Sequence, residues 1–332
     1  MNHGDALFAA TQSHGQFYLA TLNALLEKFA ALVRSPEPPH ALHTLLMREL
    51  PVVFEQLEDS ASRAGSLEFT TLMVWLSQTF QARSIPVAVL HLTLQAMQQH
   101  LLDTPDLPWR TAGLSVLEDA LQALSQPQEA RDVTKNLPML DLLLQTEPVS
   151  DAVLETPYLD LAVDQIQPAL YRVGELWQQG KISVATEHLA TLRAQNILLR
   201  GYRRAAFFPF AGRKVLVACV PGNHHTLGAQ ILGDAFEMQG WSCTVLMPGL
   251  PAEDLMFQID QCKPDVVALS AGLIQQLGST RKILQSIRLH WTSSVPVLAV
   301  GGHATQMVPH AGGALGADLW GLNARQLLQE VS

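Results

Sequence analysis

The sequence predicts an all-helical N-terminal half followed by an α/β domain with a parallel sheet, which places the chain in the α plus α/β class. Residues 1 to about 125 show apolar residues at helical spacing only. The C-terminal third instead contains three short, β-branched apolar runs at 215–220, 265–270 and 295–300, separated by helical patterns. Such runs are typical of strands that are buried on both faces of a parallel sheet.

The N-terminal half reads as a bundle of five helices. We expect them at 7–33, 42–64, 67–82, 86–102 and 108–124, with Pro51 kinking or dividing the second. The simplest interpretation is a domain of residues 1–130 whose leucines and aromatic residues form a core. The alternative is a pocket for a flat ligand, to which His91 or His100 could contribute.

A polar stretch at 125–132 separates this half from a second helical domain, predicted at residues 137–202. It should contain a short helix at 137–144 and a long one at 158–179. Gly180 then turns the chain, and Ser183 is a suitable N-cap for a helix that continues to Leu199. A linker at 201–212 leads into the α/β domain, residues 212–332.

Composition sets limits on the function. The chain has 332 residues, enough for two or three domains, and a net charge of −9, which argues against a nucleic-acid backbone as direct partner. Its three cysteines form no pair motif, as expected in a reducing cytoplasm. We find neither a signal peptide nor an apolar run of about 18 residues, so we expect a cytoplasmic protein without membrane contact.

Candidate functional residues follow the predicted strands. Asn223, His224 and His225 come directly after the first run, and a helix starts near Gly228. Ligands of parallel α/β sheets bind at the carboxyl ends of strands, so this loop lies where such a fold places its chemistry. A histidine in a loop is common, however, and these residues could also be ordinary polar loop residues.

Three motifs at strand ends together resemble cobalamin-binding domains. Asn223-x-His225-x-x-Gly228 differs by one residue from the Asp-x-His-x-x-Gly signature of that family. Ser270 matches the serine of a Ser-x-Leu motif, and Gly301-Gly302 matches a glycine pair after a later strand. The resemblance implies a flavodoxin-like or Rossmann-like sheet of five parallel strands. It also implies that His225 ligates cobalt from below while the nucleotide tail is buried in the sheet.

The helical domain adds a second resemblance. The domain contains Trp177 and, after nine intervening residues, Glu187-His188. This spacing resembles the Trp-x9-Glu-His motif in the cap of light-sensing B12 regulators of the CarH type. The resemblance implies that adenosylcobalamin lies between cap and α/β domain. Light would break the cobalt–carbon bond and free the cap, and His188 would take the upper position opposite His225. Without the resemblance, Trp177 would be a core residue and Glu187-His188 a solvated pair.

The chain departs from these motifs at two positions. Asn223 replaces the acidic residue that would hold the other N–H of the ligating imidazole, so a carboxamide accepts that hydrogen bond without charge. Gly272 stands where the Ser-x-Leu motif has leucine, which puts local packing around the buried base in doubt. His224 is an alternative ligand, although the motif spacing favours His225.

The N-terminal half also departs from CarH-type regulators, which begin with a helix-turn-helix DNA-binding domain. Residues 1–130 contain 6 Lys and Arg against 13 Asp and Glu, and show no short basic recognition helix. We therefore expect no direct DNA binding. A helical module at this place resembles the photocobilin arrangement, which implies a bilin such as biliverdin. The half contains no cysteine, so the pigment would be held without a covalent bond. Candidate anchors are His91, His100, Arg63, Arg83 and Arg110.

The sequence as a whole favours a light sensor and not an enzyme. Its output would be a change of interface in a homo-oligomer or with a protein partner that the sequence does not identify. Two alternatives remain: a corrinoid protein that carries methyl groups between methyltransferases, and a cobalamin-responsive regulator that does not respond to light. A methyl carrier needs apolar protection above the methyl group, which a Glu-His pair does not provide.

Overall fold

The computed structural model describes Asn23, Glu27 and residues 40–63, 65–126, 137–145, 147–248, 250–292 and 295–331, without the side chains of 40–49 and 51. The chain divides into two compact units, 1–130 and 131–332. Most of the helix predicted at 7–33 lies outside the described residues, although Asn23 and Glu27 are helical.

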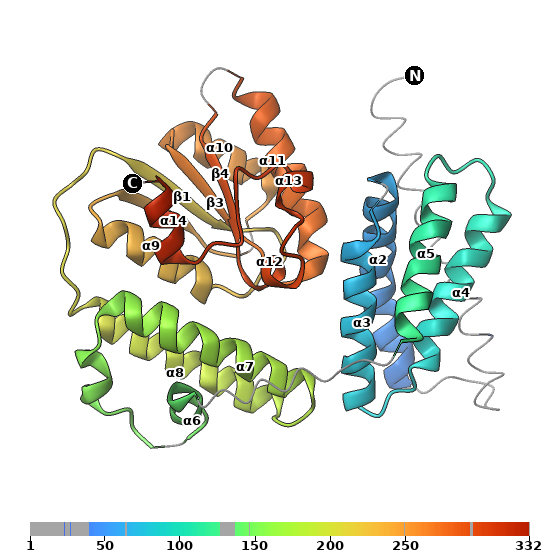
Figure 1. Ribbon diagram of the computed structural model, residues 1–332, viewed down its shortest axis with the longest axis horizontal. Coiled ribbons are helices and arrows are strands. Elements are labelled where there is room, and N and C mark those ends of the chain that lie inside the picture. The colour runs from blue at the N-terminus through green and yellow to red at the C-terminus, as the bar shows by residue number, and fades with distance from the viewer. Residues whose placement is uncertain are drawn as a thin grey trace. The chain divides into compact units, whose positions relative to one another are not determined.

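The first unit is a helical bundle in which α5 packs against the other three described helices (Figure 1). Its helices are α2 (His40–Ser62), α3 (Leu67–Ala82), α4 (Ala88–Asp103) and α5 (Arg110–Leu124). Helix α2 continues through position 51, so the predicted division there is wrong. Proline removes one backbone hydrogen bond, but its φ suits a helix. Fully buried side chains form the core: Leu57, Phe69, Met73, Leu94, Met97 and Leu117.

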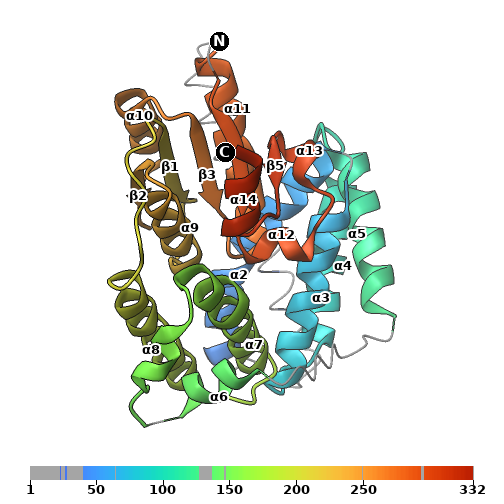
Figure 2. The same cartoon turned by 60° about the vertical axis from the view of Figure 1, so that its left-hand side comes forward.

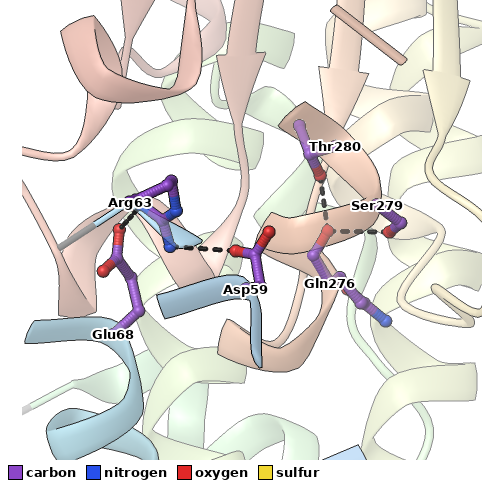
Figure 3. Close-up of polar contacts among 6 residues, drawn as sticks. All are labelled: Asp59, Arg63, Glu68, Gln276, Ser279 and Thr280. Carbon is purple, nitrogen blue, oxygen red and sulfur yellow. Dashed lines mark hydrogen bonds and ion pairs between the residues drawn. The ribbon is translucent and has the colours of Figure 1, made fainter. Parts of the chain in front are cut away.

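Arg63 joins the end of α2 to the start of α3 within the first unit (Figure 3). Its guanidinium donates to Asp59 at 3.0 Å and to Glu68 at 2.8 Å. All three side chains are largely buried, at 13%, 8% and 5% exposure. Removing Arg63 would leave two buried carboxylates without a counter-charge, so this corner depends on the guanidinium.

The second unit begins with a cap of short and long helices. They are α6 (Pro138–Leu144), the 3-10 helix η1 (Asp151–Glu155), the π-helix η2 (Asp160–Ile166), α7 (Gln167–Gln178) and α8 (Val184–Tyr202). Ser183 caps α8 as predicted, because its hydroxyl accepts from the Thr186 N–H at 3.1 Å. Gly180 turns the chain between α7 and α8 with φ +67°.

The long helix predicted at 158–179 begins with a π-helical segment. Pro168 explains the difference, because it has no N–H and its ring collides with the carbonyl four residues earlier. The backbone widens before this proline, and the Gln167 N–H donates to the Ala162 carbonyl, five residues back.

The second unit continues as a five-stranded sheet whose strands are all parallel, in the order β2-β1-β3-β4-β5. The strands are β1 (Lys214–Cys219), β2 (Ser242–Leu246), β3 (Val266–Ser270), β4 (Val297–Gly301) and β5 (Leu319–Trp320). The expected flavodoxin-like class is confirmed. The direction of the crossovers reverses between β1 and β3, which is where such sheets open a crevice at their carboxyl ends.

Helices cover both faces of this sheet. They are α9 (Leu227–Met238), α10 (Ala252–Cys262), the 3-10 turn η3 (Ile274–Gln276), α11 (Leu277–His290), α12 (His303–Met307), α13 (Gly312–Leu315) and α14 (Ala324–Val331). Helices α9 and α14 pack together, as do α11 and α13 (Figure 1). None of the helices that the structure describes is long and apolar enough to cross a membrane.

The cap and the α/β domain share one hydrophobic core. Buried side chains of both contribute to it, including Leu161, Ile166, Ile197, Val217 and Phe236. Figure 2 shows α7 and α8 lying beneath the sheet and its helices. Since one core serves both parts, the cap has a defined position over the α/β domain.

Polar contacts complete this junction. The Tyr158 hydroxyl donates to Asp234, and the Tyr202 hydroxyl donates to Glu237 at 2.5 Å, so both tyrosines bind the C-terminal half of α9. On the other side, Arg325 of α14 pairs with Asp160 and Asp164 of η2 at 2.6 and 3.0 Å.

Candidate functional site

The carboxyl ends of the three central strands are aligned. Cys219 at the end of β1 is in register with Ser270 at the end of β3, and Ser270 with Gly301 at the end of β4. The loops that follow these residues therefore start side by side at one edge of the sheet. This brings the three sequence motifs together at the reversal point of the topology.

Asn223 positions His225. The carboxamide is completely buried, and its Nδ2 donates to the Ser270 carbonyl at 2.7 Å. Its Oδ1 accepts from the His225 backbone N–H at 3.0 Å and lies 3.3 Å from the His225 Nδ1. Because this oxygen can only accept, the contact requires a proton on Nδ1. The Nε2 atom then has a free lone pair, as a metal ligand must have.

Glycines leave room for this arrangement. A Cβ at Gly272 would lie 2.6 Å from the His225 Nδ1 and 2.8 Å from the Asn223 Oδ1. The departure from leucine therefore has a physical reason in this chain, since the imidazole rests on the backbone of residue 272. At Gly302, where φ is +101°, a Cβ would lie 2.3 Å from the Ala271 carbonyl oxygen. The backbones of the two loops that follow β3 and β4 are therefore in direct contact.

The remaining predicted residues of the α/β domain lie at the same edge. Gly228, at the start of α9, would place a Cβ 3.9 Å from the Ser270 Oγ. Ser270 itself is 8% exposed. A Cβ at Gly301 would meet the Leu322 carbonyl oxygen at 3.4 Å. The structure therefore brings Asn223, His225 and these residues together at one edge of the sheet.

Gln276 is a site residue that the sequence analysis missed. Its Oε1 accepts from the N–H groups of Gly272 and Leu273 at 2.8 and 3.0 Å, and its Nε2 donates to the Gly222 carbonyl at 3.0 Å. One buried amide thus ties the loop after β1 to the loop after β3. The Gln276 carbonyl in turn accepts from the hydroxyls of Ser279 and Thr280 (Figure 3). Gln276 belongs to no motif, so only its buried, turn-forming position could have identified it.

The cap contributes a carboxylate to the crevice. Glu187 bonds the Thr191 hydroxyl at 2.9 Å and the His188 Nδ1 at 2.5 Å. Its side chain is 27% exposed, whereas that of His188 is 74% exposed. His188 therefore lies at the protein surface, with its ring bonded to Glu187. Trp177 is partly buried at the end of α7. Among the cap residues predicted from the motif, Glu187 is the one whose charge acts on His225.

The surroundings of His225 favour the neutral form of its imidazole. The ring reaches solvent, but the protein around it lowers its pKa by desolvation. The Glu187 carboxylate opposes this shift, and His224 adds to it. A neutral imidazole is the form that binds a metal, so the lowered pKa favours ligation by His225.

A cavity of about 310 Å³ lies between the cap and the α/β domain. Tyr171 and Pro168 of α7 line one side, and Gly302, Thr305 and Leu322 line the other. The Tyr171 ring also stacks on His303, with centroids 4.7 Å apart. The sequence analysis missed Tyr171, because one aromatic residue on an amphipathic helix reads as core.

These features define the class: an α/β domain that presents a strand-end imidazole beneath a helical cap. Comparison with known families agrees. Two family models, both described as B12 binding domain, match residues 213–328 and 145–198. Residues 145–198 and 213–328 therefore belong to the B12-binding domain families, and the second unit of this chain binds a cobalamin or corrinoid.

Two curated regulators from Myxococcus xanthus are similar to the chain. The HTH-type transcriptional repressor CarA is 39% identical over 27% of this chain and 31% of its own length. The HTH-type transcriptional repressor CarH is 31% identical over 48% of this chain and 52% of its own length. The expected resemblance to CarH-type regulators is confirmed, although the chain spans about half or less of these relatives.

Other relatives reveal less about function. An uncharacterized 20.5 kDa protein from Rhodobacter capsulatus is 27% identical over 49% of this chain and 85% of its own length. Among solved structures, the monomethylamine corrinoid protein of Methanosarcina barkeri covers 60% of this chain and 100% of its own, with TM-score 0.46 and 13% identity. This structural likeness is too weak to bear on function.

Proposed function

We propose that the chain is a light sensor that holds adenosylcobalamin between its cap and its α/β domain. The observation that carries the proposal is the strand-end imidazole of His225, which Asn223 orients at the edge of a sheet that the B12 binding domain model matches. When bound, adenosylcobalamin would supply a cobalt–carbon bond that light can break. His225 would hold the cobalt from below through Nε2, oriented by Asn223.

The residues at the crevice fit such a group. The imidazole lies on a floor of backbone at Gly272, and glycine at 302 lets the strand-end loops close up beneath it. Gln276 holds both loops in place, so they are organised before any ligand arrives. Ser270 is buried at the strand end and could face a nucleotide tail within the domain.

The cap residues favour a sensor over a methyl carrier. A carrier must keep water and charge away from a cobalt-bound methyl group, whereas this cap carries a carboxylate bonded to an exposed imidazole. We propose His188 as the second residue that would hold the group, from the cap side, in the illuminated form. Its exposure leaves it free to rotate away from Glu187.

An absorption spectrum tests this proposal. The full chain is loaded with adenosylcobalamin in the dark and then illuminated, and His188→Ala is treated in parallel. We expect both proteins to bind in the dark and to change on illumination, with a bis-imidazole product in the wild type alone. A wild-type spectrum that light leaves unchanged would overturn the light-sensing proposal. A bis-imidazole product in the variant would remove His188 from it.

The output we propose is a changed protein interface and not direct DNA binding. Residues 1–130 contain 6 basic against 13 acidic side chains, which disfavours contact with phosphates. The curated relatives are named HTH-type repressors, so DNA binding is the alternative to test. A labelled promoter fragment that bound the full chain at physiological salt would contradict our proposal.

We also propose that the first unit holds a bilin. The structure reduces the set of residues that could anchor this pigment. Arg63 is committed to Asp59 and Glu68, and Arg110 donates to the Leu101 carbonyl at 2.9 Å. Arg83 likewise donates to a backbone carbonyl. The His100 Nε2 lies 3.5 Å from the Thr104 hydroxyl. His91 therefore becomes the first anchor to test, and His100 the second. Co-expression with a biliverdin source should yield a red-absorbing protein whose pigment is released by acid and urea, and its absence would contradict the proposal.

A further inference from the structure

The carboxamide of Asn223 is bound by two backbone groups whose hydrogen-bonding roles are fixed. Its Nδ2 donates to the Ser270 carbonyl at 2.7 Å, and its Oδ1 accepts from the His225 backbone N–H at 3.0 Å. A carbonyl can only accept a hydrogen bond, and a backbone N–H can only donate one. The position next to Ser270 therefore requires a donor, and the position next to His225 requires an acceptor. Asparagine supplies both in one side chain, which is completely buried.

The sheet fixes the direction of the Ser270 carbonyl. Ser270 ends β3 in register with Cys219 of β1, and its carbonyl also accepts from the Val220 N–H at 3.1 Å. This second bond continues the ladder between the two strands. The carbonyl oxygen has two lone pairs, and both have donors. It therefore cannot turn away from residue 223 without breaking the end of the ladder.

The loop after β1 leaves residue 223 little room to move. The Asn223 backbone N–H donates to the Val220 carbonyl at 2.9 Å, and Gln276 binds the preceding Gly222 carbonyl at 3.0 Å. On the other side, a Cβ at Gly272 would lie 2.8 Å from the Asn223 Oδ1, so the backbone of the loop after β3 lies close to the carboxamide. A side chain at this position must therefore fit the contacts as they stand.

Aspartate, which the signature that this loop resembles has at the same position, does not fit these contacts. It has the shape of asparagine but replaces the NH2 group with oxygen. That oxygen would face the Ser270 carbonyl oxygen at the 2.7 Å that now separates a donor from an acceptor. A carboxylate there would be buried next to an acceptor and without a donor on that side, which is strongly unfavourable. The charge that would make the imidazole a stronger ligand is thus excluded by the backbone.

We propose that Asn223 is a positioning residue that aspartate cannot replace, and that this chain holds cobalamin through a neutral Asn223–His225 pair. The proposal rests on His225 as the cobalt ligand, which is part of the proposed function. The Asn223 Oδ1, 3.3 Å from the His225 Nδ1, keeps a proton on that nitrogen but adds no charge. His225 is therefore a weaker electron donor than an imidazole that is bonded to a carboxylate, and its bond to cobalt is more readily exchanged.

The order of two variants tests this proposal in the full chain. Asn223→Ala removes the carboxamide, whereas Asn223→Asp keeps its shape and adds the misplaced oxygen. Without cofactor, the midpoint of thermal unfolding should fall by about 4 °C in Asn223→Ala and by about 10 °C in Asn223→Asp. Affinity for adenosylcobalamin in the dark should fall about tenfold in Asn223→Ala and about a hundredfold in Asn223→Asp. Asn196→Asp is the matched control, because it makes the same chemical change at an exposed position of α8 and should alter neither quantity.

A spectroscopic measurement separates positioning from stability. Electron paramagnetic resonance of the reduced, paramagnetic cobalt form, in protein whose histidines carry heavy nitrogen, tells a protein imidazole from the base of the cofactor itself. We expect the imidazole signal in the wild type and a smaller fraction of it in the bound form of Asn223→Ala.

Two results would overturn the proposal: Asn223→Asp that binds as tightly as the wild type with a full imidazole signal, or Asn223→Asp that is no less stable than Asn223→Ala without cofactor. Failure of the proposed function gives a different result. If the wild type and His225→Ala showed the same signal, the ligand assignment would be wrong, whereas the order of stabilities without cofactor would still test the contact with Ser270.

Discussion

The two ends of the cap contact the α/β domain in different ways. At the end near Tyr158 and Tyr202, hydroxyls bind carboxylates of α9 over a shared apolar core. At the other end, Glu187 acts on the His225 imidazole through its charge, and His188 is exposed. The difference suggests a cap that is held firmly at one end and can respond to a ligand at the other.

The largest effect on cobalamin binding is expected at the end of the cap near Glu187 and His225. His225→Ala removes the imidazole that would ligate cobalt, so cobalamin affinity should fall at least about tenfold and the spectrum of any residual complex should change. Equilibrium titration followed by absorption measures both. His224→Ala is the control, because this neighbour lies outside the motif spacing. Unchanged affinity and spectrum for His225→Ala would refute the ligand assignment.

A second variant tests the floor beneath the imidazole. In Gly272→Ala the new Cβ would approach the His225 Nδ1 to 2.6 Å, so the ring must move while the fold remains. We expect weaker cobalamin binding, by about tenfold or less, with little change in the unfolding temperature. Gly313→Ala is the matched control, because a Cβ there meets nothing within 4 Å. Equal binding by the two variants would show that the floor does not matter.

Substitutions at the end of the cap near Tyr158 and Tyr202 should change the stability of the protein and not its affinity for cobalamin. Tyr158→Phe removes the hydroxyl that binds Asp234 and should lower the free energy of unfolding by about 1–2 kcal/mol. Tyr171→Phe is a suitable control, because its hydroxyl bonds Gln167 within the cap and does not join the cap to α9. Chemical denaturation measures the difference. If cobalamin affinity changed more than stability, the contrast between the two ends would be wrong.

The smallest effect is the pH dependence of the free energy of unfolding that Asp234 contributes, next to Tyr158. Desolvation raises the pKa of Asp234 to about 6, the Tyr158 hydrogen bond opposes this, and Glu237 adds to it. A carboxyl with a raised pKa in the folded state stabilises at low pH, and the contribution is lost as pH rises through about 6. Relative to Asp234→Asn, the wild type should therefore lose about 1–2 kcal/mol of unfolding free energy between pH 4 and pH 7, allowing for solvent screening. A difference that does not vary with pH would contradict this.

Much of the fold follows from local pattern. The apolar runs at 215–220, 265–270 and 295–300 form β1, β3 and β4 to within two residues, and 67–82 is a helix as predicted. The two-residue strand β5 is too short to leave a periodic signal. The π-helix was missed because the apolar spacing of the predicted helix at 158–179 continues through Pro168. The structure accommodates this proline by widening the turn before it, which periodicity does not reveal.

The candidate site was partly visible in the sequence for the same reason. Strand ends and glycines mark positions where a chain must turn or approach another closely, so Asn223, His225 and Gly302 could be named in advance. Gln276 could not be named, because it belongs to no motif and one of the backbone groups that it bonds, the Gly222 carbonyl, is brought close only by the fold. Tyr158 and Tyr202 were missed because their partners on α9 are brought close only by the folded chain.

The π-helical segment before α7 also sets the phase of the cap. A π turn contains one more residue than an α turn, and the following helix is rotated by that residue, about 100°, relative to an uninterrupted α-helix. Deleting one residue between 160 and 166 would restore regular winding and turn Tyr171 and Trp177 away from their present directions. The alignment of the cap with the sheet edge therefore depends on the length of this segment. The loss of a single residue from it would be enough to destroy that alignment.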